Sequence, residues 1–242
     1  MAQTVESTRT SSSAPRKPGR LTPWIIAALG AVLIAGGISA LVHHRSSKSN
    51  NGLATFMNVT RLPANHLAPD FTLSDQNGRT VSLDGLRGKA VVLEFMDSHC
   101  TDICPIVSQE FVDAHRDLGA RASQIAFVAV NVNPWHTTRA DVASFTDDQG
   151  LNRVPEWHFL TGPPDQLQPI WKAYGIEVVA PNPNVDVQHS DTMYFIDPSG
   201  QERMVAEPTD DHMANGTAYL PPAQIVHWGK GIATYAAEFA PH

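Results

Sequence analysis

Two cysteines, Cys100 and Cys104, are the residues whose type and spacing most directly indicate chemistry in this chain. They are the only cysteines among 242 residues, and Pro105 follows where the first turn of a helix tolerates proline. A thiol between a buried strand and a helix start meets backbone N–H groups and the positive end of the helix dipole, which lower its pKa. With four-residue spacing, both sulfurs fall on one side of the first turn, within reach of a disulfide or of one metal ion.

The elements that must position this pair form a three-layer α/β domain with a mixed sheet. Apolar runs and turn residues predict strands at residues 71–73, 80–83, 90–96, 125–132, 157–160, 192–196 and 202–206, and helices at residues 105–119, 138–149, 165–174 and 222–239. The run AVVLEFM at residues 90–96 is almost continuously apolar, so we expect this strand to be covered on both faces and central. The cysteines follow it directly.

The N-terminal region has a different composition. Residues 1–23 are expected to be a disordered cytoplasmic tail, because their Ser, Thr, Arg and Pro content offers little apolar surface to bury. Residues 24–42 form a run of 19 residues without a charge, which at about 1.5 Å per residue spans roughly 30 Å of hydrocarbon. We therefore expect one transmembrane helix, followed by a linker at residues 43–65. A cleaved signal peptide is the alternative, although its apolar region usually covers only about 7–15 residues.

The distribution of charge bears on topology and on partners. Residues 1–48 carry six basic residues against one glutamate, whereas the remaining 194 residues carry 11 basic against 23 acidic residues. Four of the basic residues precede the apolar run, so the positive-inside rule puts the N-terminus in the cytoplasm and the acidic domain outside the cell membrane. An acidic body is a poor partner for phosphate backbones, which argues against nucleic-acid binding. Two cysteines are too few for a disulfide scaffold or an all-cysteine zinc site.

Three separated motifs give the chain a resemblance to a known family. They are the opening APDFTL at residues 68–73, the Cys-x-x-x-Cys-Pro motif preceded by His99, and VQHS at residues 187–190 followed by YFIDPSG at residues 194–200. Together they resemble the Sco/SenC family of membrane-anchored, thioredoxin-like copper proteins. The resemblance implies that residues 66–242 are a thioredoxin-like domain that assists assembly of the copper centre of cytochrome c oxidase, with the copper-bearing oxidase subunit as partner.

The same resemblance implies that Cys100, Cys104 and His189 bind copper. Two thiolates and an imidazole are a soft set suited to Cu(I), and an open fourth position could admit Cu(II), with zinc as the competing metal. We expect His99 to support the site without binding metal, because neighbouring residues of an extended segment point to opposite faces. His212 and His227 have no motif support.

The chain departs from the family pattern at two positions near the motif. The family usually has proline after the first cysteine, where this chain has Thr101, and an acidic residue where this chain has Asn133. The first difference changes loop stiffness but not the ligand set. The second puts in doubt any role of that acid in metal delivery or docking. The proline-rich residues 179–185 lead to His189 and either move its imidazole or serve as a passive connection.

Three functions compete on this sequence. A copper metallochaperone would transfer Cu(I) by ligand exchange between thiolate-rich sites. A thiol–disulfide reductase would use Cys100 and Cys104 as a redox pair, acting on the cysteines of the oxidase subunit or of other exported proteins. A peroxidase of the peroxiredoxin kind shares the APDF opening, but the paired cysteines and His189 speak against it. The first two need the same cysteines, and only His189 is surplus to a pure reductase.

Overall fold

The central element of the molecule is a six-stranded mixed sheet. The computed structural model describes residues 52–209 and 211–241. Its sheet has the strand order β1-β10-β9-β4-β5-β6. The strands are β1 (Thr60–Arg61), β4 (Ala90–Met96), β5 (Ile125–Asn131), β6 (Trp157–Leu160), β9 (Met193–Ile196) and β10 (Glu202–Ala206). Strands β4, β5 and β6 are parallel, whereas β9, β10 and β1 complete the sheet by antiparallel pairing. The predicted mixed sheet with a central strand at residues 90–96 is confirmed.

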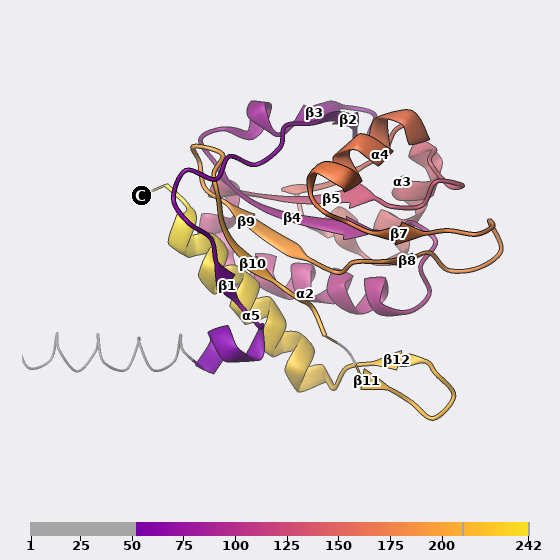
Figure 1. The fold of residues 1–242 in the computed structure, drawn as a ribbon. Coiled ribbons are helices and arrows are strands. Elements are labelled where there is room, and N and C mark those ends of the chain that lie inside the picture. Colours follow the sequence, from indigo (N-terminus) through magenta and orange to yellow (C-terminus); the bar gives the residue numbers. More distant parts are fainter. Residues whose placement is uncertain (1–51, 210, 242) are drawn as a thin grey trace, which may run out of the picture. The chain divides into compact units, whose positions relative to one another are not determined.

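Helices and a hairpin cover the two faces of this sheet (Figure 1). One face packs against α2 (Ile103–Leu118), α3 (Arg139–Asp148) and α5 (Pro222–Phe239). The opposite face packs against α4 (Pro164–Ala173) and the hairpin of β2 (Thr72–Ser74) and β3 (Thr80–Ser82). Every residue of β4 is buried, because its side chains alternate between these two cores. The three-layer arrangement predicted from the sequence is confirmed.

Helices α2 and α5 approach each other closely at Gly229. A Cβ atom at this position would lie 2.6 Å from the Cβ of Asp113 and 3.0 Å from the carbonyl oxygen of Glu110. Any larger residue would therefore push α5 away from α2. Since α2 carries Cys104, this contact fixes the helix that bears the site against its neighbour.

The remaining elements are short. They are the 3-10 helices at Asp84–Leu86, Gly119–Gln124 and Leu151–Arg153, and the strands β7 (Val178–Val179), β8 (Gln188–His189), β11 (Asp211–His212) and β12 (Ala218–Tyr219). Strand β7 pairs with β8, and β11 with β12. Strands of two residues show no periodicity in a sequence, so these two ribbons were not predicted.

The folded domain begins earlier than expected. Residues 43–65 were predicted to be a linker, but residues 52–56 are helical, and β1 pairs with β10 at the edge of the sheet. Leu53 and Met57 are buried in the core that α5 covers. Within residues 52–65 the prediction of a linker was therefore wrong, because two apolar side chains anchor the segment.

The predicted tail and transmembrane span, residues 1–23 and 24–42, lie outside the described residues. Within residues 52–209 and 211–241, none of the helices combines the length and the apolar character needed to cross a membrane.

Candidate metal centre

The cysteine pair lies where the central strand ends and α2 begins. Cys100 is half-buried and Cys104 is buried at the first turn of α2, and both are free thiols. The sulfur of Cys100 accepts hydrogen bonds from the backbone N–H groups of Asp102, at 3.5 Å, and of Cys104, at 3.4 Å. The first N–H groups of a helix have no partner within the helix, so they are available to a thiolate. The predicted position of the pair is confirmed.

The two thiols differ in acidity. A hydrogen bond from the Cys104 side chain, opposed by burial and assisted by the two backbone N–H groups, lowers the pKa of Cys100. The same hydrogen bond, together with burial, raises the pKa of Cys104 well above its ordinary range. Cys100 is therefore the more acidic thiol of the pair, and Cys104 is the thiol that donates to it.

His189 lies on β8 with a defined ring orientation. Its Nδ1 is 2.9 Å from the carbonyl oxygen of Ser190, so Nδ1 carries the proton and donates it. Burial lowers the pKa of His189 below 6.5, which keeps the imidazole neutral at pH 7. A neutral ring with Nδ1 bonded to a carbonyl presents Nε2 as a metal ligand.

The structure brings the two sulfurs together but leaves His189 apart from them. Among the described residues, the one group of three histidine, cysteine or acidic side chains whose ligand atoms all lie within 4.8 Å of one another is His99, His136 and Asp141. Cys100, Cys104 and His189 do not meet this distance criterion. A single ion bound by all three would therefore require their side chains, or the segment that carries β8, to rearrange.

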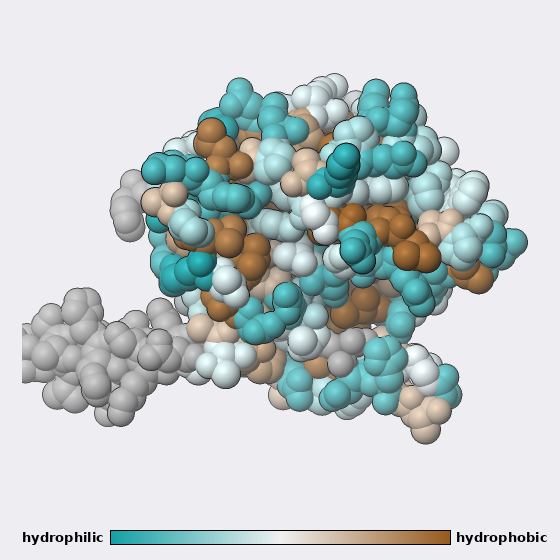
Figure 2. Space-filling view, in the orientation of Figure 1, coloured by the Kyte–Doolittle hydropathy of each residue, from teal (hydrophilic) through white to brown (hydrophobic). Residues whose placement is uncertain are grey.

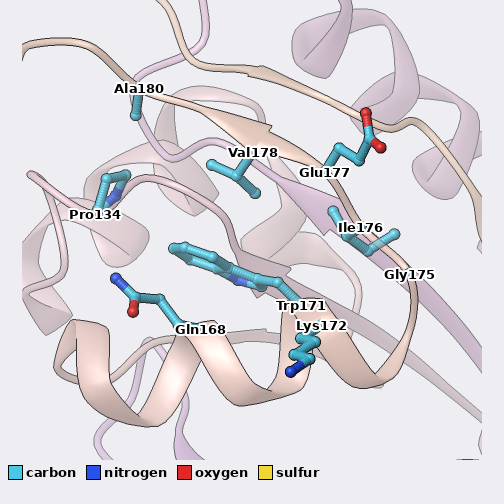
Figure 3. A pocket seen from close by; sticks show the side chains of 9 residues that line it. All are labelled: Pro134, Gln168, Trp171, Lys172, Gly175, Ile176, Glu177, Val178 and Ala180. Carbon is cyan, nitrogen blue, oxygen red and sulfur yellow. The ribbon is translucent and has the colours of Figure 1, made fainter.

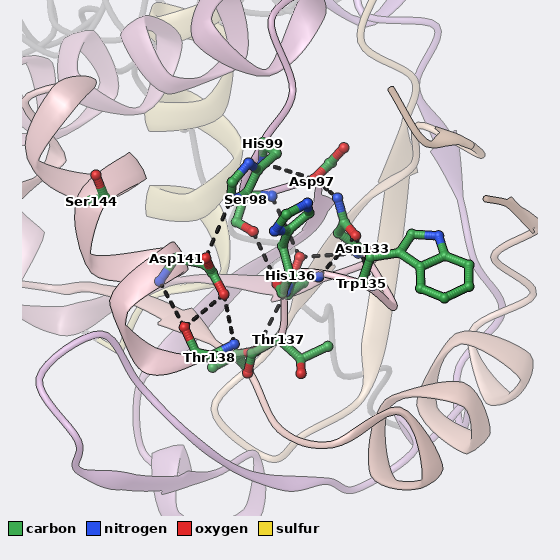
Figure 4. Close-up of polar contacts among 12 residues, drawn as sticks. Asp97, Ser98, His99, Asn133, Trp135, His136, Thr137, Thr138, Asp141 and Ser144 are labelled. Carbon is green, nitrogen blue, oxygen red and sulfur yellow. Dashed lines mark hydrogen bonds and ion pairs between the residues drawn. The ribbon is translucent and has the colours of Figure 1, made fainter. Parts of the chain in front are cut away.

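Asp97 joins the loops around the cysteine pair (Figure 4). Its Oδ1 accepts hydrogen bonds from the backbone N–H of His99 and from the amide Nδ2 of Asn133, both at 2.8 Å. Its Oδ2 accepts a hydrogen bond from the backbone N–H of Val187 at 3.4 Å. This buried carboxylate thus ties the loops after β4 and β5 to the segment that leads into β8. Asn133, one of the two departures from the family pattern, serves as a donor to it.

Thr101, the other departure, also makes a contact. Its hydroxyl donates to Oδ2 of Asp186 at 2.9 Å, which links the cysteine loop to the segment before β8. Proline has no side-chain hydroxyl and could not make this bond. On the other side of the loop, Oδ1 of Asp102 accepts from the backbone N–H of Ala218 at 2.7 Å, which holds the β11–β12 ribbon. The cysteine loop is thereby attached to two ribbons that the sequence did not predict.

A cavity of about 570 Å³ lies beside the proline-rich segment (Figure 3). Trp171, Ile176 and Val178 form its apolar lining, and neither cysteine borders it. Figure 2 shows apolar side chains gathered over the β7–β8 region, where Val179 and Val185 are among the exposed large hydrophobic residues. The cavity also has polar lining from Gln168, Lys172 and Glu177, so it is a hollow of mixed character next to the segment that carries His189 and is not part of the sulfur site.

Sequence reasoning missed His136 and Asp141. The structure brings both to His99, which was expected to have only a supporting role. His136 follows β5 and Asp141 lies in the first turn of α3. The carboxyl ends of the parallel strands β4 and β5 meet at one edge of the sheet, so residues after both strands could have been expected to meet.

The fold and the thiol site define a class of protein, the thioredoxin-like domains with a cysteine pair at the start of a helix. The family model described as SCO1/SenC matches residues 59–217. The chain belongs to this family, which confirms the resemblance seen in the sequence.

The individual relatives include a SenC protein and a protein named as a peroxiredoxin. Protein SenC of Rhodobacter capsulatus is 30% identical over 179 residues, covering 72% of this chain and 77% of the relative. A putative peroxiredoxin of Mycobacterium tuberculosis is 31% identical over 117 residues, covering 48% of this chain and 68% of the relative.

Solved structures share the fold. The structure of Bradyrhizobium japonicum ScoI with copper bound has a TM-score of 0.54 and 21% identity, covering 72% of this chain and 99% of that one. BsSco, described as a member of the Sco family of cytochrome c oxidase assembly proteins with a disulfide switch, has a TM-score of 0.51 and 23% identity, covering 71% and 96%. The chain therefore has a mixed α/β, thioredoxin-like fold.

Proposed function

We propose that this protein binds copper and assists assembly of the copper centre of cytochrome c oxidase, with Cys100, Cys104 and His189 as the metal ligands. One observation carries the proposal: the Cys100 sulfur receives two backbone N–H groups and lies in hydrogen-bond contact with Cys104. Membership of the SCO1/SenC family and the copper-bound structure of a fold neighbour support the same choice of metal. In this role copper is the cargo that the protein receives and delivers.

The donor set fits copper in its reduced state. Two sulfurs held side by side and a neutral imidazole are soft ligands, which suit Cu(I) better than harder ions. Cys100 is half-buried, so an incoming thiolate from an acceptor protein can reach it and replace one ligand at a time. His189 would join the sulfurs through movement of the segment before β8, which Asp97 and Thr101 attach to the cysteine loop.

A thiol–disulfide reductase is the second candidate, and the unequal acidity of the two cysteines favours it. The Cys100 thiolate would attack a target disulfide, forming a mixed disulfide and releasing one target thiolate. Cys104 would then lose its proton and attack the Cys100 sulfur, which frees the second target thiolate and leaves a Cys100–Cys104 disulfide. An external dithiol would restore the pair. The peroxiredoxin relative supports thiol redox chemistry of this general kind.

The proposal includes a membrane location. Residues 24–42 would span the cell membrane once, with the N-terminus in the cytoplasm and the domain outside, where tethering raises its effective concentration near a membrane-bound oxidase. Intact-mass measurement of protein extracted from membranes tests this. A mature chain that begins near Leu41 in the soluble fraction would show that the segment is a cleaved signal peptide.

Copper titration tests the ligand set. The full-length chain in detergent is titrated with Cu(I) and with Cu(II) against a competing chelator, alongside Cys100→Ser and His189→Ala. We expect one tightly bound Cu(I) per chain, and sulfur-to-copper charge-transfer absorption with Cu(II) that is lost in Cys100→Ser. The exposed His227, changed to alanine, serves as the control and should leave affinity unchanged. Unaltered charge-transfer absorption and Cu(I) affinity after loss of both cysteines would reject the assignment.

A further inference from the structure

A second group of potential metal ligands lies beside the cysteine pair. His99, in the loop after β4, stacks on His136, in the loop after β5, with ring centroids 3.6 Å apart and planes 20° from parallel. The Nε2 atom of His99 is 3.2 Å from Oδ1 of Asp141, at the start of α3 (Figure 4). Two imidazoles and a carboxylate from three separate segments therefore converge on one place.

Their spacing fits a metal ion. Metal–ligand distances of about 2.0–2.2 Å for histidine nitrogen and carboxylate oxygen put two ligands of a tetrahedral ion about 3.3 Å apart. The observed 3.2 Å between His99 and Asp141 is close to that value, and the ligand atoms of all three residues lie within 4.8 Å of one another. Binding an ion would displace the proton of the hydrogen bond between Nε2 and Oδ1. The His136 ring, now stacked on that of His99, would have to turn so that one of its nitrogens faces the ion.

Other histidine–carboxylate pairs provide an internal comparison. Within the described residues, such pairs are His66 with Glu202, His115 with Glu156, His158 with Asp75, and His212 with Asp102. None of these pairs has a third ligand within the 4.8 Å criterion, which among the described residues only His99, His136 and Asp141 meet. The second imidazole thus separates this group from an ordinary surface ion pair.

The neighbouring residues orient the ligands. Thr138 donates to Oδ2 of Asp141 from its backbone N–H at 2.8 Å and from its hydroxyl at 2.7 Å, which leaves Oδ1 toward the histidines. The backbone N–H of His99 is fixed by Asp97. Hydrogen bonds of this kind, made to the far side of a ligand, are the usual support of a metal site.

The group is also accessible. The side chain of His99 is 46% exposed and that of Asp141 is 19% exposed. A cavity of about 330 Å³ is lined by His99, Asp141 and Cys100. An ion can therefore reach the group from solvent, at a point that borders the outer sulfur of the pair.

We propose that His99, His136 and Asp141 form a second metal site, separate from the cysteine pair, that takes a divalent transition-metal ion. Imidazole and carboxylate ligands favour borderline ions, and the order of affinities among first-row metals puts Cu(II) above Zn(II). The site contains no sulfur, so it selects a different oxidation state of copper from the one a thiolate pair prefers. This inference does not depend on the proposed delivery of copper.

The test removes the sulfurs first. The full-length chain with Cys100→Ser and Cys104→Ser is titrated in detergent with Cu(II), and separately with Zn(II), against a competing chelator. We expect one ion per chain, tighter binding of Cu(II), and an electron paramagnetic resonance spectrum with nitrogen hyperfine structure. A Cys100→Ala and Cys104→Ala background serves if the serine variant does not fold.

Two further substitutions decide whether this site is responsible. His136→Phe keeps a stacked ring but removes the ligand nitrogen, and Asp141→Asn keeps the shape of the carboxylate but removes its charge. Each should weaken Cu(II) binding by at least about 10-fold and alter the nitrogen hyperfine structure. His115→Ala removes a histidine that also pairs with a carboxylate and should change neither. Affinity and spectrum unchanged in both substitutions, or only weak binding of several ions, would overturn the proposal.

Discussion

Two buried carboxyl groups, those of Glu94 and Asp97, have opposite environments, although they lie only three residues apart at the end of β4. Asp97, just beyond the end of the strand, accepts hydrogen bonds from His99, Asn133 and Val187. Glu94, within the strand, receives one backbone N–H, from Phe95, and its other side-chain partner is the acidic Asp191. Burial and nearby acidic groups, first among them Asp191, raise the pKa of Glu94 well above its ordinary range.

The difference arises from where backbone donors are free. Within a strand or a helix, most N–H groups bond to neighbouring backbone carbonyls, whereas a loop or a helix start leaves several available. Asp97 and the Cys100 sulfur both lie where such donors exist. Glu94 receives a single backbone N–H, from Phe95. Burial, followed by nearby acidic groups, also raises the pKa of Glu110, within α2. Polar chemistry in this domain is therefore supported at the carboxyl edge of the sheet and penalised in its interior.

Asn133→Asp would remove the amide donor that Asn133 supplies to the buried carboxylate of Asp97. The new carboxylate would lie about where the amide now lies, 2.8 Å from Oδ1 of Asp97. Because two buried like charges repel, we expect the unfolding free energy at pH 8 to fall by roughly 2–4 kcal/mol.

The pH dependence of this variant identifies the cause. Repulsion raises the pKa of one carboxyl of the pair, so stability is retained at acidic pH and lost as pH rises through the raised pKa. Urea unfolding at pH 5 and pH 8 measures the effect. Asn184→Asp, in the exposed segment before β8, is the control and should change little. A loss of stability equal at both pH values would show that packing, and not charge, is responsible.

Glu110→Gln should stabilise the protein at high pH, because it removes a carboxyl group that burial disfavours in its charged form. The raised pKa means that the folded state binds the proton more tightly than the unfolded chain, so this contribution to stability is complete below the ordinary value of 4.5 and declines as pH rises through the folded-state pKa. Glutamine stays neutral at every pH. We expect an increase of roughly 1–3 kcal/mol in unfolding free energy at pH 8, and little change at pH 4.

The same urea measurements across pH test this prediction. Glu177→Gln alters an exposed glutamate and should leave the pH profile unchanged. If Glu110→Gln destabilises the protein equally at pH 4 and pH 8, then the glutamate makes a favourable contact that the comparison with Asp97 overlooks.

The sequence predicted the elements that follow from long apolar runs. The central strand at residues 90–96, the helix that carries Cys104 and the closing helix at residues 222–239 all appear as expected, because each has a clear hydrophobic pattern. The position of the cysteine pair could be predicted equally well, since it depends on the strand and helix that flank the pair.

The contacts around the cysteine pair could not be predicted from the sequence. The contacts of Asp97 with Asn133 and Val187 join residues 36 and 90 positions apart, and no local pattern encodes them. The stacking of His99 on His136 depends on the parallel pairing of β4 with β5, which the sequence indicates only in outline. Side-chain hydrogen bonds between loops are decided by tertiary structure, so they appear only when the fold is known.

The two cysteines allow a smaller version of the same comparison. Cys100 has backbone donors and a lowered pKa, whereas Cys104 is buried and has a raised pKa. In the reduced, metal-free protein at pH 7, iodoacetamide should modify Cys100 at least about 10-fold faster than Cys104. Peptide mass spectrometry after short reaction times measures both rates.

A pair of substitutions isolates the hydrogen bond between the thiols. Cys104→Ala removes the donor and should slow alkylation of Cys100 by raising its pKa, whereas Cys104→Ser retains a hydroxyl donor and should slow it less. Equal rates for both variants would mean that the backbone N–H groups alone set the acidity of Cys100.

The hydrogen bond between Thr101 and Asp186 should have the smallest effect, because both residues are exposed and water can replace either partner. Thr101→Val keeps the shape of the side chain and removes the hydroxyl. We expect unfolding free energy to fall by about 0.5–1 kcal/mol, which a double-mutant cycle with Asp186→Ala would assign to the pair.

The more informative readout is hydrogen exchange in residues 181–189. Val187 would remain attached through Asp97, at a longer distance of 3.4 Å. Exchange should therefore quicken in residues 182–186 and stay slow at Val187. Fast exchange at Val187 as well would show that Thr101 holds the whole segment, including His189, against the cysteine loop.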